Sequence, residues 1–276
     1  MAPRRRPDTR DRAIESSMGS ARDYRCAYEF MQRAADIYAQ SLRGNRDATA
    51  YLRGRGFSGA TIRAFGLGYA PRDDAIRRAL CTTPDAAHKI RLAHDISLIC
   101  RTDDGTYRDF LRDRIIFPIK WPDKKGKFRV VAFSGRATRE GDSAKYINSR
   151  KTFLYNKSAM VYGLDHAHTA ILKTGTVVLV EGYTDCIAAH QGGVRNVVAA
   201  SGTAFTDESA HILSMYAKYA RVVMDPDQAG QDGGAAAVDA LRRAGVEATL
   251  VTLPDGLDPA DFIRSRGAEA LAEVVQ

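Results

Sequence analysis

Apolar runs alternate with helical segments through the last hundred or so residues of the chain, and this alternation limits the possible folds more than any other feature. The apolar runs are TVVLV, RNVV, ARVV and EATLV, and a segment with helical patterning separates each from the next. Strands that alternate with helices in this way form a parallel sheet. Residues 177–180 are all apolar, as expected for a strand covered on both faces. The sequence therefore predicts an α/β domain over residues 169–276.

The preceding part of the chain is patterned differently. Residues 28–42 carry apolar side chains at three- and four-residue spacing, which is typical of an amphipathic helix, and glycines divide residues 47–71 into two further short helices. The segments RIIFPIK and FRVVAFSGR flank the loop WPDKKGK, which predicts a β-hairpin. We therefore expect an α+β subdomain over residues 21–168, preceded by a mobile basic arm at residues 1–20.

Charge divides the chain at nearly the same place. Residues 1–150 contain 31 Lys and Arg against 18 Asp and Glu, whereas residues 151–276 contain 10 against 15. A basic half indicates a polyanionic partner such as nucleic acid, and an acidic half indicates either a solvated face or carboxylates around cations. No apolar run approaches the roughly 18 residues of a membrane span, and no signal-peptide pattern follows the arginine-rich start. We expect a soluble, cytoplasmic protein with no membrane partner.

Acidic residues follow three of the predicted strands. Glu181 comes directly after VVLV, Asp225 and Asp227 come after RVVM, and Asp258 follows the last strand, while Asp185 lies one helical turn beyond Glu181. The carboxyl ends of parallel strands form the ligand-binding edge of a sheet, so these side chains should converge. Carboxylate oxygens suit Mg²⁺ or Mn²⁺ rather than zinc. Such ions could activate an attacking oxygen and stabilise a departing phosphate.

Simpler roles fit several of the same residue types. A carboxylate at a strand end can merely cap a helix, as we expect of Asp207. His166 and His168 are interpreted as surface or capping groups, and Trp121 as the anchor of the predicted hairpin loop. The four cysteines are far apart and form no C-x-x-C pair, which argues against zinc and disulfides. We expect buried, reduced thiols at Cys26, Cys81, Cys100 and Cys186.

The segments around the carboxylates resemble a known metal-dependent domain. The series VEGYTD, ASGTAFT, VVMDPDQAG and LPDGLDPADF resembles the Toprim domain. Upstream, YLRGRGFSGATIRAFGLGYAP, RDRIIFPI, FSGRAT, KYINS and YNKSAMVYGL are similar, in this order, to the rest of the catalytic core of bacterial DnaG-type primases. The resemblance covers about residues 25–270. The ordered series is much more specific than any one of its motifs.

This resemblance implies a primase core that makes short RNA primers from ribonucleoside triphosphates on single-stranded DNA. It implies that Glu181 is the metal-linked general acid or base, and that Asp225 and Asp227 bind Mg²⁺ with help from Asp185 and Asp258. A further set would hold nucleotide phosphates or template: Arg112, Arg136, Lys145, Asn148 and Lys157. Each of these cations, taken alone, also fits a solvated surface charge.

The chain departs from the family pattern in two respects. The second acidic position of the family's last D-P-D segment is Ala260 here, and the sequence leaves open whether Asp261 replaces it. The zinc ribbon and helicase-binding module of the family are not among the motifs found. We therefore expect no zinc site in this chain, and a replicative helicase or a zinc-ribbon module on another chain as partner.

Two other functions fit these residues. A Toprim nuclease would cleave phosphodiesters with the same carboxylates. A non-catalytic module that binds single-stranded DNA in the replisome would use the basic half alone, with aromatic side chains that stack on bases. The aromatics considered for that role are also candidates for the core of the hairpin: Phe128, Phe133, Tyr146 and Tyr155.

Overall fold

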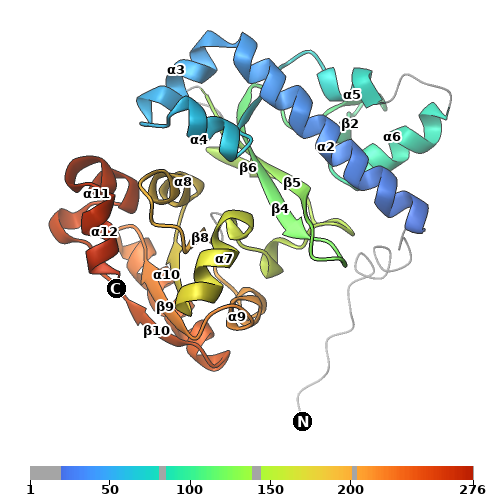
Figure 1. Cartoon of the computed structure of the whole chain (residues 1–276). Helices are drawn as coiled ribbons and strands as arrows, with labels where there is room; N and C mark the ends of the chain where they lie inside the picture. Colours follow the sequence, from blue (N-terminus) through green and yellow to red (C-terminus); the bar gives the residue numbers. More distant parts are fainter. Residues whose placement is uncertain (1–19, 81–84, 139–143, 201–203, 276) are drawn as a thin grey trace.

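The computed structural model describes residues 20–80, 85–138, 144–200 and 204–275, and divides their strands between two four-stranded sheets and a small two-stranded one (Figure 1). The arm expected at the N-terminus, apart from residue 20, and Cys81 lie outside the described residues. The first large sheet is antiparallel, with the order β1-β4-β5-β6. Its strands are β1 (Gly68–Ala70), β4 (Arg114–Pro122), β5 (Phe128–Ala137) and β6 (Tyr146–Asn148).

Helix α2 (Ala21–Gly44) lies along this antiparallel sheet (Figure 1). The apolar stripe predicted from the sequence is buried at Met31, Tyr38 and Leu42, among other positions. The helix begins seven residues earlier than predicted because Ser20 and Asp23 form a capping box that satisfies its first backbone N–H groups.

Close contact between α2 and β1 depends on a glycine. A Cβ atom built at Gly68 would lie 2.5 Å from the Tyr38 Cβ, so a larger residue would push the strand away from the helix. The Tyr38 ring in turn meets the Phe133 ring of β5 edge to face, with the centroids 5.2 Å apart. These contacts fix the position of the helix over the sheet.

The two short helices predicted after α2 are confirmed as α3 (Arg46–Gly54) and α4 (Gly59–Ala64). No sequence pattern indicated the elements that follow them, which are α5 (Ala75–Leu80), α6 (Ala86–Asp95) and the hairpin of β2 (Ile99–Arg101) and β3 (Tyr107–Asp109). The buried Asp109 joins the hairpin to α5, because its carboxylate accepts hydrogen bonds from the backbone N–H groups of Ile76 and Arg77.

The predicted hairpin is confirmed as the pair of β4 and β5, but its loop is shorter than expected. Trp121 and Pro122 belong to β4, and the connection contains only residues 123–127. The placement of Trp121 in the loop was therefore wrong. Its half-buried indole packs against both hydrophobic cores of the molecule, so it anchors the hairpin against the second half of the chain.

The second large sheet is parallel throughout, with the order β10-β9-β7-β8. Its strands are β7 (Thr176–Val180), β8 (Val197–Ala199), β9 (Tyr219–Val223) and β10 (Glu247–Leu250). The predicted fold class, an α+β part followed by a parallel α/β domain, is thereby confirmed. Buried residues of β7 alternate between the two faces: Val177 and Leu179 join one hydrophobic cluster, Val178 and Val180 the other.

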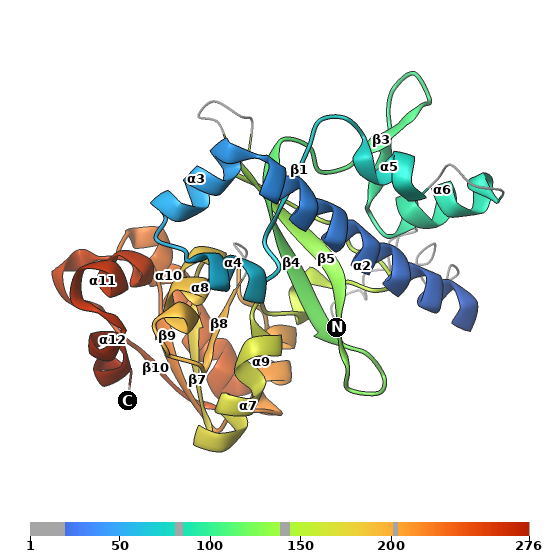
Figure 2. The same ribbon diagram turned by 45° about the horizontal axis from the view of Figure 1, so that its top comes forward.

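Helices cover both faces of the parallel sheet (Figures 1 and 2). One face packs against α7 (Leu164–Thr174), α9 (Asp207–Ser214) and α10 (Gln228–Arg243), and the other against α8 (Tyr183–Gln191), α11 (Pro259–Arg266) and α12 (Ala268–Val274). Short 3-10 turns, η1 (Lys157–Ala159) and η2 (Pro254–Gly256), complete the described elements. Within the part of the chain that the structure describes, no helix combines the length and apolar character needed to cross a membrane.

The two halves share an extensive contact. The core of the antiparallel half is continuous with the α8 face of the parallel sheet. Gln191, at the end of α8, adds polar contacts: its Oε1 accepts hydrogen bonds from the Ser58 backbone N–H at 2.8 Å and from Thr61 Oγ1 at 2.6 Å, and its Nε2 donates to the Gly56 carbonyl at 2.8 Å. The boundary predicted after residue 168 falls inside α7, whose buried side chains pack with β7 and β9.

Candidate active site

The carboxyl ends of β7 and β9 place two of the predicted acidic residues side by side. These strands are neighbours, and Val180 pairs with Val223. Glu181 therefore leaves β7 at the level where Met224 and Asp225 leave β9. The sheet thus brings together residues that are more than forty positions apart in the sequence.

Several charged side chains at this edge affect the pKa of Asp225. Burial is the largest cause of its rise to about 6; the negative charges of Glu181, Asp258 and Asp227 also raise it, and the positive charge of Lys145 lowers it. Each of these groups must lie close enough to act on the half-buried Asp225 carboxyl. The predicted acids Glu181, Asp227 and Asp258 and the predicted cation Lys145 therefore all lie within electrostatic range of Asp225.

Asp185 lies beneath this edge and is buried. Burial raises its pKa to about 7, with contributions from the charges of Asp258 and Asp225. The backbone N–H groups of Gly182 and Ala260 donate hydrogen bonds to its carboxylate and oppose that rise. Ala260, where the family has an acid, thus contributes through its backbone.

Asp227 and Asp258 also cap helices. One carboxylate oxygen of Asp227 accepts a hydrogen bond from the Gly230 N–H at 2.8 Å, and one of Asp258 accepts from the Asp261 N–H at 2.7 Å. Gly230 is required by the turn itself, because a Cβ there would lie 2.2 Å from the Asp225 carbonyl oxygen. The first turn of α10 therefore packs directly on the backbone that carries Asp225.

The structure gives Asp207 and Asp261 other contacts than those considered from the sequence. Thr206, not Asp207, caps α9, because the Thr206 hydroxyl accepts a hydrogen bond from the Ser209 N–H. Asp207 is the first helical residue and pairs with Arg243 at 2.7 Å. The carboxylate of Asp261 contacts Arg264 of its own helix, so its described partner lies away from the acidic edge.

The predicted phosphate-binding residues are divided among several places. Lys145 is exposed and lies within electrostatic range of Asp225. Arg136 donates a hydrogen bond to the Tyr146 hydroxyl at 2.7 Å and covers the rings of Tyr146 and Tyr51. Asn148 accepts a hydrogen bond from the Tyr183 hydroxyl at 3.0 Å. Asn148 thus makes a structural contact that the sequence did not indicate.

The described contacts of Arg112 and Lys157 do not involve the acidic edge of the parallel sheet. The Arg112 guanidinium donates to the Arg72 carbonyl and lies 3.9 Å from the Asp74 carboxylate, both within the antiparallel half. Lys157 belongs to η1, which packs on α9, and burial lowers its pKa. No described contact connects either side chain with the carboxylates named above.

Two residues that position the site were not indicated by any sequence motif. The Tyr183 ring, two positions after Glu181, stacks on Phe117 of β4 with the centroids 5.4 Å apart. The buried Arg114 donates hydrogen bonds to the carbonyls of Gly135 and Ala144, at 3.3 and 2.9 Å, and so holds the segment that carries Lys145. A charged residue at the start of an apolar strand was the only available signal for Arg114.

The burial of the histidines and cysteines agrees only in part with the expectations from the sequence. His166 stacks on Phe65 at 4.1 Å, so its interpretation as a surface group was wrong. The Nδ1 atom of His168 faces carbonyls of the first turn of α7. Cys186 is buried as predicted, whereas Cys26 and Cys100 are only half-buried.

The aromatic side chains considered for base stacking are core or half-buried residues. Phe133 and Tyr155 are buried, and Phe128 packs against His168 with the centroids 4.9 Å apart. Tyr146 is half-buried and contacts Tyr183. This placement agrees with the hairpin-core alternative.

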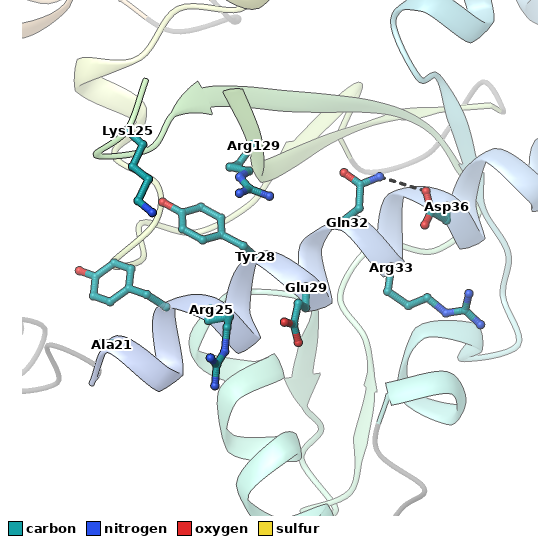
Figure 3. Close-up of a pocket in the computed structure, with 10 residues that line it drawn as sticks. Ala21, Arg25, Tyr28, Glu29, Gln32, Arg33, Asp36, Lys125 and Arg129 are labelled. Atoms are coloured by element: carbon teal, nitrogen blue, oxygen red, sulfur yellow. Dashed lines mark hydrogen bonds between the residues drawn. The ribbon is translucent and has the colours of Figure 1, made fainter. Parts of the chain in front are cut away.

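A cavity of about 380 Å³ opens beside Glu181, with a mainly apolar lining that includes Ala200, Phe205 and Met224. A larger cavity of about 860 Å³ lies elsewhere, between α2 and the β4–β5 hairpin (Figure 3). Among the residues that the structure describes, no three His, Cys, Asp or Glu side chains form a ready-made metal cluster. The carboxylates nevertheless fit a divalent cation: burial is the main cause of the raised pKa values of Asp185 and Asp225, and the neighbouring negative charges that add to it are ones a cation would balance.

Comparison with known families gives two matches that follow one another along the chain. Residues 37–168 match the family described as "DNA primase catalytic core, N-terminal domain", and residues 178–263 match the family described as "Toprim-like". A DNA primase of Aquifex aeolicus (strain VF5) is 37% identical over 248 residues, which make up 90% of this chain and 48% of that protein. The chain spans less than half the length of the curated relatives reported first.

Solved structures show the same arrangement of elements. The RNA polymerase domain of the Mycobacterium tuberculosis primase DnaG matches with a TM-score of 0.80 and 31% identity, covering 94% of this chain and 84% of that one. A DnaG primase catalytic domain bound to ssDNA matches with a TM-score of 0.79 and 30% identity, covering 93% and 82%. Both similarities extend over the two sheets.

Proposed function

This chain belongs to the family of DnaG-type DNA primases, and from that premise we propose that it polymerises short RNA primers on single-stranded DNA. The family resemblance seen in the sequence is confirmed for both halves of the chain. A relative with the same fold has been solved with ssDNA bound, which supports a single-stranded DNA template for this chain. The proposed substrates are ribonucleoside triphosphates.

The proposed reaction is nucleotidyl transfer. The 3′-hydroxyl oxygen of the growing primer attacks the α-phosphorus of a ribonucleoside triphosphate, a new P–O bond forms, and the bond to the β-phosphate breaks with release of pyrophosphate. Glu181 would accept the hydroxyl proton as the general base. Asp225 and Asp227 would hold Mg²⁺ or Mn²⁺, with Asp185 and Asp258 in support. A divalent cation bound there neutralises phosphate charge and makes the hydroxyl more acidic.

The basic residues have separate proposed roles. Lys145 is the cation best placed to meet the phosphates of a metal-bound nucleotide, because it already acts on Asp225. Arg136 and Lys157 would contact further phosphates of the nucleotide or template, and Arg112 would contact the template in the antiparallel half. Asn148 would act mainly by positioning Tyr183, to which it is hydrogen-bonded.

One observation carries this proposal beyond the family comparison. Asp225 is influenced at the same time by Glu181 of the parallel sheet and by Lys145 of the antiparallel half. A cation of the antiparallel half therefore lies within electrostatic range of the carboxylates of the parallel half, which supports a meeting of template phosphates and a metal-bound triphosphate there.

The test is primer synthesis with single-stranded DNA, ribonucleoside triphosphates and Mg²⁺. Glu181→Gln and Asp225→Asn should each lower synthesis at least a hundredfold with little change in the circular dichroism spectrum. Asp239→Asn is a matched control, because Asp239 is an exposed acid on α10. Full synthesis by both active-site variants would refute the assignment.

The same assay separates the two alternatives. A Toprim nuclease would shorten labelled single-stranded DNA with Mg²⁺ and without nucleotides. A non-catalytic binding module would bind DNA in a salt-sensitive manner and show no metal-dependent turnover. Because helicase and zinc-ribbon partners on other chains are part of the proposal, the assay is also run with those components added.

A further inference from the structure

A cavity of about 370 Å³ lies where the end of α2 meets α3 and α4. Figure 2 shows these three helices side by side on the antiparallel half, with α4 next to the parallel half. Arg43, Arg53 and Arg63 line the cavity, and each is exposed. The apolar part of its lining consists of Ala39, Leu42, Ile62 and Leu67. The cavity therefore combines an apolar surface with three arginine side chains.

Each arginine has a simple local explanation. Arg43, Arg53 and Arg63 occupy the last turns of α2, α3 and α4, where a cation interacts favourably with the helix dipole. That explanation does not require the three side chains to line one cavity. No Asp or Glu is among the described lining residues, and among the described residues none of the three guanidinium groups has an ion pair.

The larger cavity along α2 provides a contrast. Figure 3 shows that its lining mixes cations such as Arg25 and Arg33 with the carboxylates of Glu29 and Asp36. Asp36 there accepts a hydrogen bond from Gln32 at 3.0 Å. Positive charge at that cavity is thus partly balanced within the lining, whereas at the smaller cavity it is not.

We propose that the cavity lined by Arg43, Arg53 and Arg63 binds a free nucleoside polyphosphate at a site separate from the carboxylates. A guanidinium group can donate two parallel hydrogen bonds to phosphate oxygens. Three arginines that line one cavity therefore suit a ligand with more than one phosphate. The sugar or base would lie on the apolar lining. The cavity volume is within the range of small-molecule sites.

The lining favours a free nucleotide over a DNA strand. Surfaces that follow single strands stack successive bases on aromatic side chains, and no aromatic residue is among the described residues that line this cavity. The proposal does not depend on primer synthesis by this chain, since it concerns binding at a different surface.

The test is a titration of the whole chain with fluorescent mant-ADP in EDTA, which suppresses metal-dependent binding at the carboxylates. The triple variant Arg43→Gln, Arg53→Gln, Arg63→Gln should bind at least tenfold more weakly than wild type. The control is Arg25→Gln with Arg33→Gln, which removes two exposed arginines of α2 that line the other cavity and should leave the affinity unchanged. Unlabelled pyrophosphate should displace mant-ADP from wild type.

Three outcomes would overturn the proposal. The first is equal affinity of the triple variant and wild type. The second is an equal loss in the control pair, which would indicate a non-specific charge effect. The third is a triple variant that binds mant-ADP as wild type does but binds an oligo(dT) strand tenfold more weakly. That result would make the surface part of a template path. Thermal melting of each variant shows that it is folded. A triple Arg→Lys variant that binds mant-ADP at an intermediate level would support contacts that depend on guanidinium geometry.

Discussion

The Tyr183 hydroxyl donates a hydrogen bond to Asn148 Oδ1 at 3.0 Å, and this bond joins the two halves of the molecule. Tyr183 begins α8 just after Glu181, whereas Asn148 ends β6 of the antiparallel sheet. The Tyr183 ring is buried between Phe117 and Tyr162, with centroid distances of 5.4 and 4.8 Å. The turn that carries Glu181 is therefore fixed against the half that carries Lys145.

Tyr183→Phe should reduce the free energy of unfolding by about 1 kcal/mol, because it removes this hydrogen bond and leaves the Asn148 oxygen without its partner. The ring contacts remain in this variant. Chemical denaturation measures the loss, with Tyr219→Phe as the control because Tyr219 is 42% exposed. The same unfolding free energy in Tyr183→Phe and wild type would show that the bond contributes nothing to stability.

Removal of a carboxylate should stabilise the metal-free protein. The folded-state pKa of Asp225 is raised to about 6, so the folded state binds its proton more tightly and ionisation costs stability as the pH rises from about 4 to 6. At pH 7.5 in EDTA, Asp225→Asn should therefore raise the Tm by about 2–4 °C, equivalent to about 1 kcal/mol for this half-buried group.

Added Mg²⁺ should instead make wild type more stable than Asp225→Asn. It should raise the Tm of wild type, since a ligand that binds only the folded state stabilises it, and should raise the Tm of Asp225→Asn much less. Differential scanning fluorimetry with and without Mg²⁺ measures both effects. An equal response of the two proteins to Mg²⁺ would mean that the ion binds somewhere else.

Gly230→Ala should distort the turn that carries Asp225 and Asp227. The added methyl group would lie 2.2 Å from the Asp225 carbonyl oxygen, so the backbone must move, at a cost of about 1–3 kcal/mol in stability. Primer synthesis should fall at least tenfold. Gly233→Ala on the same helix is the control, because nothing lies within 4 Å of a Cβ there, and it should stabilise the protein by about 0.5–1 kcal/mol. Similar stability of the two variants would contradict this account.

His190 should make the protein less stable in mild acid. Burial lowers its pKa from 6.5 to about 4, and the Nε2 atom lies 2.8 Å from the Val197 carbonyl. The unfolded chain binds a proton below about pH 6.5 and the folded chain does not, so stability is lost as the pH falls. Between pH 7 and pH 5 the loss should be about 2 kcal/mol.

Urea denaturation at the two pH values measures this effect. His190→Gln should reduce the pH dependence, whereas His211→Gln should not, because His211 is exposed. His166, which is also partly buried with a lowered pKa, contributes with the same sign in all three proteins. An unchanged pH dependence in His190→Gln would exclude His190 as its source.

The parallel half was predicted well because each of its strands and helices has a recognisable pattern within one short stretch of sequence. Each strand is a short apolar run, each helix has its own pattern, and parallel pairing then forces the residues after β7 and β9 to one edge. The acidic residues at that edge can therefore be identified from the sequence alone.

Contacts between distant segments could not be predicted in the same way. The hairpin of β2 and β3 has strands of three residues each, too short for a reliable periodicity, and α5 depends on capping by the distant Asp109. Arg112 was selected from the motif RDR, whereas Arg114 is the buried residue that holds the Ala144 carbonyl. Which of two nearby arginines points inward depends on the register of β4, and that register is set by pairing with β5.

The caps on α10 and α11 have a consequence for how a cation enters. Asp227 and Asp258 each give one oxygen to a backbone N–H of the helix that follows, so both side chains are oriented before any ion arrives. Under the proposed function, an incoming Mg²⁺ would find these two carboxylates already oriented, and the main remaining cost would be loss of water from its own hydration shell, which this ion gives up reluctantly. Occupancy should accordingly respond to ion concentration without a refolding phase.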